Sequence, residues 1–359
     1  MERHNFRKWE NRIYLGVFFR EVRGVFVQTQ PHPSKGEIGF TGRFYLLEEG
    51  QRGGIQVAQR VEQSSPAEIS LSPEGIVLSS SVERFPTMRQ FPLFPKEFSG
   101  EKRWQAFGLR VLDPDFNGKI TVVPVYVDYR YEGITSYRNE QGHRIVGKYA
   151  VRYKGSTDYS NDPDLLEVQG THDVSLFLSV KEGGLRFITE TFKEEYRFRG
   201  ERIVKLEGTV VTFFEGLSPD ISPELTKALE KVASIPDIEI QDTIEGITLR
   251  VKNLRFKPDS SELLPEEVPR LKILSDSLKS IQGKKFLVVG HTADVGNPAG
   301  QNQLSVERAK AIVGRLTREG IPQEKLLYEG RGAREPIAPN THEEGRSQNR
   351  RVEIIVLEE

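Results

Sequence analysis

The residues whose types and spacing come nearest to a metal site lie between two predicted strands. Asp113, Asp115 and Asn117, followed by Gly118, resemble the start of a calcium-binding loop. Such a loop has a bidentate glutamate at its twelfth position, and this chain has Pro124 there. Because a strand also follows directly, we interpret this segment as a hairpin turn.

The other reactive residue types do not form a catalytic or metal-binding pattern. Glu194 and Glu195 are adjacent in a predicted strand, so their side chains point to opposite faces and cannot act as a pair on one sugar. The chain has no cysteine, and its six histidines lack the spacing of zinc ligands. The acidic segment 158–164 is interpreted as a solvated loop, with a weak cation site as the alternative. We therefore predict no catalytic residue, no metal and no cofactor.

The composition predicts a globular protein with more than one core. Hydrophobic residues make up 36% and charged residues 29% of the chain, which argues against disorder. A length of 359 residues favours two or three domains. The 51 basic and 52 acidic residues leave a net charge of −1, so we predict no nucleic-acid partner.

The start of the chain does not settle the cellular compartment. MERHNF lacks the apolar core and the cleavage site of a secretory signal. Either a signal was removed before this numbering, the start is assigned too late, or the protein is cytoplasmic. No stretch approaches the ~18 to 20 consecutive apolar residues of a membrane-spanning helix.

From Asn11 to about Gly216 the hydrophobic pattern has a period of two, which indicates half-buried strands. Short glycine turns, such as 182–185 and 199–202, predict antiparallel pairing. The fold class expected for residues 1–217 is therefore an antiparallel β-rich module, sandwich-like or barrel-like. The proline-rich segment 85–98 is expected to cross the sheet, with a possible break into two subdomains near 85–100.

A change of pattern after residue 217 marks a domain boundary. Pro223 and a stripe of apolar residues predict a linker helix within 218–237. Residues 238–359 then alternate between strand and helix, which predicts a β-α-β-α-β-β domain with helices on one face of a mixed sheet. The predicted elements are a strand at 247–251, a helix at 268–281, a strand at 286–289, a helix at 304–318, and strands at 326–328 and 352–357.

Residues 238–359 also carry blocks whose order and spacing resemble the OmpA-like domain family. These blocks are FKPDSSEL (256–263), GHT (290–292), LS (304–305), RA (308–309), EPI (335–337), NT (340–341), GR (345–346) and NRRV (349–352). The resemblance implies a non-catalytic domain that binds peptidoglycan, gripping the diamino acid of the stem peptide and the neighbouring carboxylates. A guanidinium suits this task because its fork of donors matches a carboxylate two bonds at a time.

The resemblance also implies which residues bind. Arg308, placed near the start of its predicted helix, is assigned the ligand carboxylate, with help from the helix dipole. Arg350 matches a second arginine of the groove. The remaining residues implied to support these arginines or to line the groove are Arg346, Asn349, Thr292, Leu304 and Ser305.

The sequence departs from the family pattern at the position whose side chain is implied to bind the ligand's ammonium group. The family has an aspartate directly after Gly-His-Thr, and this chain has Ala293 there, followed by Asp294. Gln301 likewise stands where the family prefers asparagine, with Asn302 beside it. We expect Asp294 and Asn302 to substitute, with Asp259 as a further carboxylate.

These observations predict a periplasmic or outer-membrane-associated protein of the cell envelope. Its C-terminal domain is expected to anchor a β-rich module to the cell wall, and that module to face the membrane or an outer-membrane or periplasmic protein partner. The alternative is a β-rich ligand-binding or adhesin-like protein whose divergent OmpA-like domain no longer binds the wall, as Ala293 suggests.

Overall fold

A computed structural model describes residues 1–29, 37–50, 58–72, 76–90, 102–155, 161–181, 183–214, 223–252, 254–257 and 260–358. The chain divides into two compact units. The N-terminal unit comprises Met1–Arg52 and Ser64–Leu217, and the C-terminal unit comprises Gly53–Gln63 and Ser218–Glu359. Each unit is described by itself below.

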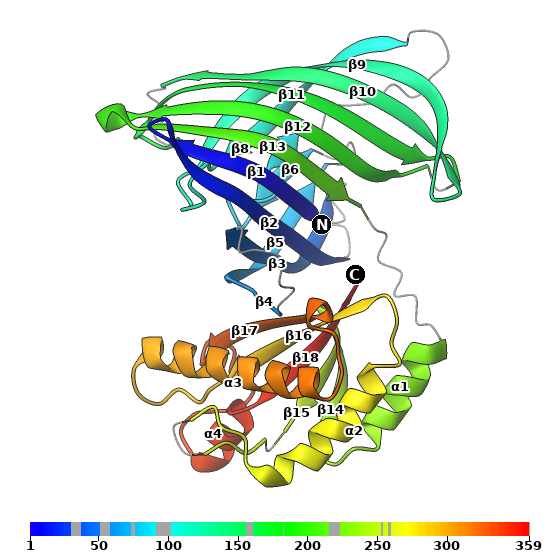
Figure 1. Ribbon diagram of the computed structural model, residues 1–359, viewed down its shortest axis with the longest axis vertical. Coiled ribbons are helices and arrows are strands. Elements are labelled where there is room, and N and C mark those ends of the chain that lie inside the picture. The colour runs from blue at the N-terminus through cyan, green and yellow to red at the C-terminus, as the bar shows by residue number, and fades with distance from the viewer. Residues whose placement is uncertain are drawn as a thin grey trace. The chain divides into compact units, whose positions relative to one another are not determined.

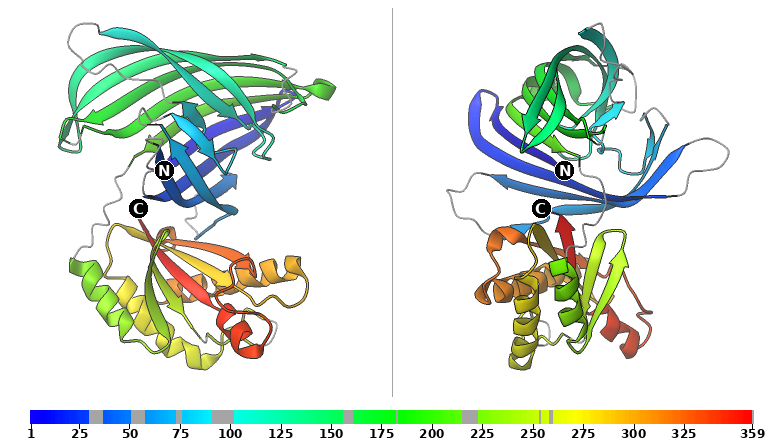
Figure 2. Two further views of the ribbon diagram at one scale, coloured as in Figure 1. Left: turned by 180° about the vertical axis from the view of Figure 1, so that it is seen from behind. Right: turned by 90° about the vertical axis from the view of Figure 1, so that its right-hand side faces the viewer.

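The N-terminal unit contains one twelve-stranded sheet, in the order β6-β5-β3-β2-β1-β13-β12-β11-β10-β9-β8-β7. Its long strands curve strongly, which gives a nearly closed, barrel-like shape (Figures 1 and 2). The strands are β1 (Glu2–Glu10), β2 (Ile13–Gln28), β3 (Ile38–Gly50), β5 (Gln63–Leu71), β6 (Val77–Ser80), β7 (Met88–Gln90), β8 (Arg103–Leu112), β9 (Thr121–Tyr137), β10 (Glu140–Lys154), β11 (Leu165–Ser179), β12 (Leu185–Phe198) and β13 (Ile203–Phe213). The prediction of an antiparallel β-rich module is confirmed.

The alternating hydrophobic pattern explains why these segments form strands with one dry face. In β9, Val123, Val125 and Val127 are at most 1% exposed, whereas Tyr126, on the other face, is 63% exposed. Short turns join neighbouring strands. Arg138 and Asn139, for example, both have positive φ, as a two-residue hairpin requires.

The segment that resembles a calcium loop is a turn between β8 and β9, as predicted. The carboxylate of Asp113 accepts hydrogen bonds from the backbone N–H groups of Asn117 and Gly118, both at 3.0 Å. Arg84 Nε lies 2.9 Å from the same carboxylate. Asp115 forms an ion pair with Arg202 at 2.6 Å. The two acids are therefore engaged by amides and guanidinium groups.

Two features of the N-terminal sheet differ from the sequence analysis. The strand pattern was placed from Asn11 onward, but β1 precedes it and pairs with both β2 and β13. The proline-rich segment, predicted to cross the sheet with a possible break into two subdomains, contains strand β7, which pairs with β8 within the same sheet as the strands before it. Residues 91–98 of this segment lie outside the described residues.

The C-terminal unit contains a six-stranded mixed sheet, in the order β14-β15-β18-β16-β17-β4. Strands β16 and β17 run parallel, β4 runs parallel to β17, and the other neighbours are antiparallel. Its strands are β4 (Gln59–Arg60), β14 (Ile238–Thr243), β15 (Gly246–Val251), β16 (Lys284–His291), β17 (Leu326–Gly332) and β18 (Val352–Glu358), and its α-helices are α1 (Pro223–Ala233), α2 (Val268–Leu278), α3 (Pro298–Arg318) and α4 (Glu343–Asn349). Compared with the predicted β-α-β-α-β-β order, the structure adds strand β14 before β15 and helix α4 before β18.

One hydrophobic core joins the helices of this unit to one face of its sheet. Leu274 from α2, Ile312 from α3 and Val288 from β16 are all fully buried in it. Helix α1 packs into the same core through Leu225 and Val232, so the segment expected to be a linker helix is part of the C-terminal unit. None of the described helices is long and apolar enough to cross a membrane.

Candidate functional site

Five of the predicted binding residues, Thr292, Asp294, Arg346, Asn349 and Arg350, lie on segments that meet at one edge of the C-terminal sheet, which we call the site edge; Asn302, Leu304, Ser305 and Arg308 lie on helix α3. Because β16 and β17 are parallel, their carboxyl ends reach the same edge. Antiparallel pairing of Val352 with both Val251 and Gly290 brings the end of β15 and the start of β18 there as well. The segments that follow or precede these strand ends are 252–264, 292–297 and 333–351.

Two glycines let helix α3 lie against the sheet at the site edge. A Cβ atom on Gly290 would be 2.1 Å from the carbonyl oxygen of Ser305, and one on Gly330 would be 2.4 Å from Ser305 Oγ. The Ser305 hydroxyl donates to the carbonyl of Asn302 at 2.7 Å and accepts from the N–H of Gly332 at 3.0 Å. Ser305 is fully buried, so it holds the helix to β17 and does not present its hydroxyl to a ligand.

Asn349 holds the loop between β17 and α4. Its side-chain oxygen accepts from the backbone N–H groups of Ile337 and Ala338, at 2.8 and 3.1 Å. Its amide nitrogen donates to the carbonyl of Ala338 at 2.8 Å and to Asn340 Oδ1 at 2.9 Å. Asn349 is fully buried, so its contribution to the site is to fix this loop.

Asn340 connects the predicted residues of three segments. Its side-chain oxygen accepts both from Asn349 and from the backbone N–H of Asp294, the latter at 3.1 Å. Arg346 Nη1 donates to the carbonyl of Asn340 at 3.2 Å. The structure therefore brings Asp294, Arg346 and Asn349 together. Asn340 lies within a block of the resemblance, but it was not assigned a role from the sequence.

The departure at residue 293 has a structural explanation. Ala293 is 5% exposed, so an aspartate there would face the interior in this backbone conformation. Asp294, in contrast, is exposed, and its carboxylate accepts from Gln301 Nε2 at 3.2 Å. Thr292 is buried, and its N–H donates to Gly332 at 2.9 Å. The acid that reaches solvent in this loop is thus Asp294.

Arg308 contacts the segment between β15 and α2. Its Nε donates to the carbonyl of Ser260 at 3.2 Å, and its guanidinium carbon lies 4.9 Å from the centre of the Phe256 ring. Arg308 is half-buried. Asp259, which was expected nearby, lies outside the described residues.

The prediction that Arg308 lies near the start of its helix, where the helix dipole would assist it, is wrong. Helix α3 begins at Pro298, capped by Asn297, whereas the predicted helix began at Leu304. Arg308 is therefore ten residues into the helix, and the dipole acts only within the first turn. Leu304 and Asn302 lie nearer the start of α3, and both are half-buried.

Arg346 and Arg350 share one acid. Glu343 accepts from Arg346 Nε at 2.9 Å and also from Arg350 Nη2. Hydrogen bonds from Arg350 and Arg346 lower the pKa of the Glu343 carboxyl. Arg350 is 39% exposed and Glu343 is 65% exposed, so this cluster is open to solvent and to a ligand that replaces Glu343.

A second set of charged residues in this unit is buried and was missed from the sequence. Arg331 is 2% exposed and forms ion pairs with Glu245, Glu329 and Glu335 at 2.7, 3.2 and 3.0 Å. Beside the site edge, His291 Nε2 lies 3.5 Å from a carboxylate oxygen of Glu353. Glu329 and Arg331 lie just beyond the strand predicted at 326–328, within the longer strand β17 (Leu326–Gly332). Two opposite charges spaced two residues apart directly after an apolar strand were the signal that could have revealed this set.

Comparison with known proteins decides the family of this unit. Residues 255–350 match the OmpA family model. These residues form an OmpA-family domain. The recognition made from the sequence is confirmed.

Similar proteins match this chain only in part. The peptidoglycan-binding protein ArfA of Mycobacterium tuberculosis is 32% identical over 124 residues, which are 34% of this chain and 37% of ArfA. Outer membrane protein A of Bordetella avium is 35% identical over 102 residues, 28% of this chain and 53% of that protein. The cell wall anchor of the T6SS from Pseudomonas aeruginosa is a solved structure with 27% identity and a TM-score of 0.34, and the match covers 38% of this chain and 99% of that one. The chain thus spans about a third to a half of the length of the two curated relatives.

Among the described residues, no group of three or more His, Cys, Asp or Glu side chains could hold a metal ion. The groups that the structure brings together at the site edge are guanidinium, carboxylate and amide groups. These groups can bind a ligand that carries both carboxylates and amines.

Proposed function

We propose that the OmpA-family domain binds peptidoglycan at the site edge without catalysing a reaction, and that it anchors the N-terminal unit to the cell wall within the cell envelope. The family match supports this proposal, as does the name of ArfA, a peptidoglycan-binding protein. The finer proposal is that the ligand is the peptide stem, recognised through its diamino acid.

The chemistry of the stem peptide fits the charged groups of Arg308 and of the site edge. Its carboxylates suit the guanidinium groups of Arg308, Arg346 and Arg350, since each can donate two parallel hydrogen bonds. Its ammonium suits the exposed carboxylate of Asp294. One charge-assisted hydrogen bond contributes about 1.5 to 3 kcal/mol, so several contacts, or several copies of the protein on one wall, are needed for firm attachment.

The observation that carries this proposal is the hydrogen-bond network centred on Asn340. It joins the loop of Asp294 to Arg346 and to the buried Asn349. The carboxylate of Asp294, for a ligand ammonium, and the guanidinium of Arg346, for a ligand carboxylate, are thereby held on connected segments before any ligand binds. Such preorganisation lowers the cost of ordering the site on binding.

Binding to purified wall sacculi tests the proposal. The intact protein should sediment with sacculi, and Arg308→Ala and Asp294→Ala should each reduce the bound fraction at least about tenfold, the loss of one contact of about 1.4 kcal/mol or more. Arg318→Ala is the matched control, because Arg318 is an exposed arginine near the end of the same helix. It should bind as the intact protein does.

Ala293, which stands in the place of the family's aspartate, favours a second candidate function. In that case the chain is a ligand-binding envelope protein whose OmpA-family domain does not hold the wall. Failure of the intact, folded protein to sediment with sacculi would support this second function and refute the first.

A further inference from the structure

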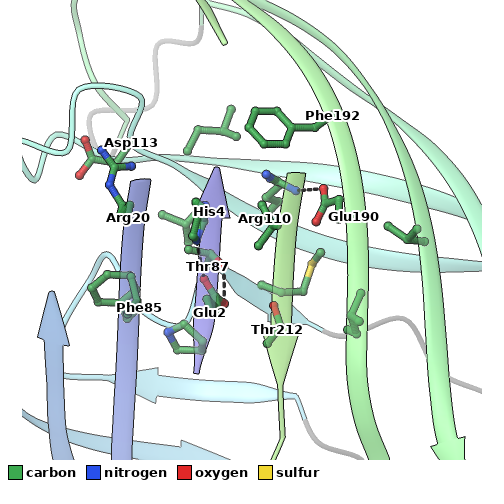
Figure 3. Close-up of a pocket in the computed structure, with 18 of the residues that line it drawn as sticks. Glu2, His4, Arg20, Phe85, Thr87, Arg110, Asp113, Glu190, Phe192 and Thr212 are labelled. Atoms are coloured by element: carbon green, nitrogen blue, oxygen red, sulfur yellow. Dashed lines mark hydrogen bonds and ion pairs between the residues drawn. The ribbon is translucent and has the colours of Figure 1, made fainter. Parts of the chain in front are cut away.

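The N-terminal unit encloses a cavity of about 350 Å³ on the concave side of its sheet. Its walls come from strands that lie far apart in the sequence of the N-terminal unit, including β1, β2, β8 and β12 (Figure 3). The volume lies within the range of about 300 to 1,000 Å³ that is typical of small-molecule sites.

Most of the cavity wall is apolar. Aromatic rings from separate strands and from the segment before β7 line it, among them Phe6, Phe44, Phe85 and Phe192. Aliphatic side chains from β12 and β13, such as Ile188, Leu206 and Val210, complete this surface. A molecule that fills the cavity must therefore bury an apolar body.

A compact polar group interrupts the apolar wall. Arg110 Nη1 donates to Glu190 Oε1 at 2.8 Å and also to the hydroxyl of Tyr149, and its Nη2 lies 3.6 Å from Glu194 Oε1. The hydroxyl of Tyr149 donates to Glu190 at 2.7 Å, and that of Tyr196 donates to Glu194 at 2.6 Å. All five side chains line the cavity, and Figure 3 shows the contact of Arg110 with Glu190. We call them the Arg110 cluster.

His172 supports this cluster from outside the cavity wall. Its two ring nitrogens face the two carboxylates, with Nδ1 bonded to Glu190 and Nε2 3.2 Å from Glu194. The ring stacks on Tyr149 with 4.3 Å between ring centres, and its side chain is fully buried. The histidine thus fixes the positions of both carboxylates.

The charges of the Arg110 cluster favour a ligand that donates hydrogen bonds. Arg20 and Arg84 also line the cavity, but each guanidinium is paired with a carboxylate, that of Glu48 at 3.1 Å and that of Asp113 at 2.9 Å. In the Arg110 cluster two carboxylates share one arginine, with His172 behind them. On the β1 side, the Glu2 carboxylate accepts from Thr87 at 3.2 Å and faces His4 (Figure 3). A ligand carboxylate would add one more anion beside these acids in a poorly solvated site, which is unfavourable. A hydroxyl or an amine would instead donate to oxygens that have free lone pairs.

We propose that this cavity binds a small amphipathic molecule whose apolar body lies against the phenylalanine and aliphatic wall and whose hydroxyl or amine donates to Glu190 or Glu194. The buried ion pairs also have a cost that apolar packing would avoid. Their position beside an open volume, where a ligand can use their remaining lone pairs, matches the few convergent polar groups of small-molecule sites.

The test is a fluorescence titration of the full chain with N-phenyl-1-naphthylamine, an apolar amine whose emission rises in apolar surroundings. Saturable binding at one site is expected. Dodecanol and dodecylamine should displace the probe at concentrations at least tenfold lower than laurate, which has the same chain length but a carboxylate. The absence of saturable binding, or displacement by laurate at equal or lower concentration, would overturn the proposal.

Two tryptophan substitutions on β12 locate the probe. Ile188→Trp fills the cavity and should weaken binding at least tenfold. Thr191→Trp places the same bulk on the exposed face of the strand and should bind the probe as the unaltered chain does. Equal affinity in both variants would place the probe elsewhere and refute the inference. No wall fragment takes part, so the result is independent of whether the OmpA-family domain binds peptidoglycan.

Discussion

Replacing Asn349 by alanine should loosen the loop 333–342 at the site edge. The substitution removes four hydrogen bonds, two accepted from the N–H groups of Ile337 and Ala338 and two donated to Ala338 and Asn340. A net contribution of about 0.5 to 1.5 kcal/mol for each bond gives a total of about 2 to 6 kcal/mol. Because Ile337 is 39% exposed, water can replace part of this loss, so we expect a value near 2 kcal/mol.

Hydrogen exchange measured on the full chain tests this expectation at the affected amides. A loss of about 2 kcal/mol in the local opening free energy corresponds to exchange about 30-fold faster at Ile337 and Ala338. Gln348→Ala is the control, because Gln348 is exposed in the same helix. Sacculus binding should fall with Asn349→Ala, since the loop carries Asn340. Unchanged exchange at both amides would refute the role assigned to Asn349.

Three further predictions concern stability. Gly330→Ala should lower the free energy of unfolding of the C-terminal unit by about 1 to 3 kcal/mol, because the added methyl group clashes with Ser305. Gly314→Ala, at an open position of α3, should instead raise it by up to about 1 kcal/mol. Thermal unfolding followed by helical circular dichroism measures both variants, and equal effects would contradict the close packing of α3 at Gly330. Arg331→Met should cost about 3 to 5 kcal/mol because it leaves buried carboxylates unpaired, and faster amide exchange along β17 is the readout; unchanged exchange would show that the ion pairs contribute little. Burial and Arg110 lower the pKa of His172, but the two facing carboxylates outweigh them, so its pKa is raised above 6.5. The protonated His172 therefore stabilises the folded N-terminal unit. This contribution is complete below pH 6.5 and is lost as the pH rises through the raised pKa. Both tryptophans of the chain lie in the N-terminal unit, so urea unfolding followed by tryptophan fluorescence reports the stability of that unit. His172→Gln should abolish the dependence of this stability on pH above 6.5. A pH dependence that survives the substitution would assign the dependence to other groups.

Local pattern was sufficient to predict most strands of the N-terminal unit, because the buried and exposed faces alternate cleanly in β9 to β12. It failed for β1, where Phe6 alone among nine residues is buried and the strand is held by pairing with β2 and the distant β13. Such long-range pairing leaves little trace in the sequence of one strand. The same is true of α4, which is seven residues long and polar, and is held in place by Asn349.

The limits of the site prediction have similar causes. Helix α3 was started too late because its first residues, from Pro298 to Gln303, lack an apolar stripe, although Asn297 and Pro298 are a capping signal. The Arg110 cluster was missed because Glu194 was considered only as a pair with its neighbour Glu195, and Glu190 was not considered. The two-residue spacing of Glu190 and Glu194 with Phe192 and Tyr196 places all four on one buried face, which marks charges inside a core.

The short strand β4 has a practical meaning for anyone who wishes to produce the wall-binding part alone. Gln59 and Arg60 pair with Leu327 and Tyr328, and Val61 donates to the carbonyl of Tyr328 at 2.9 Å. A truncated protein that begins at residue 218 would lack this strand, and the backbone of β17 would be open to association with other copies. Aggregation of such a fragment would then reflect a missing neighbour, and adding a peptide that spans residues 53–63 should restore its solubility.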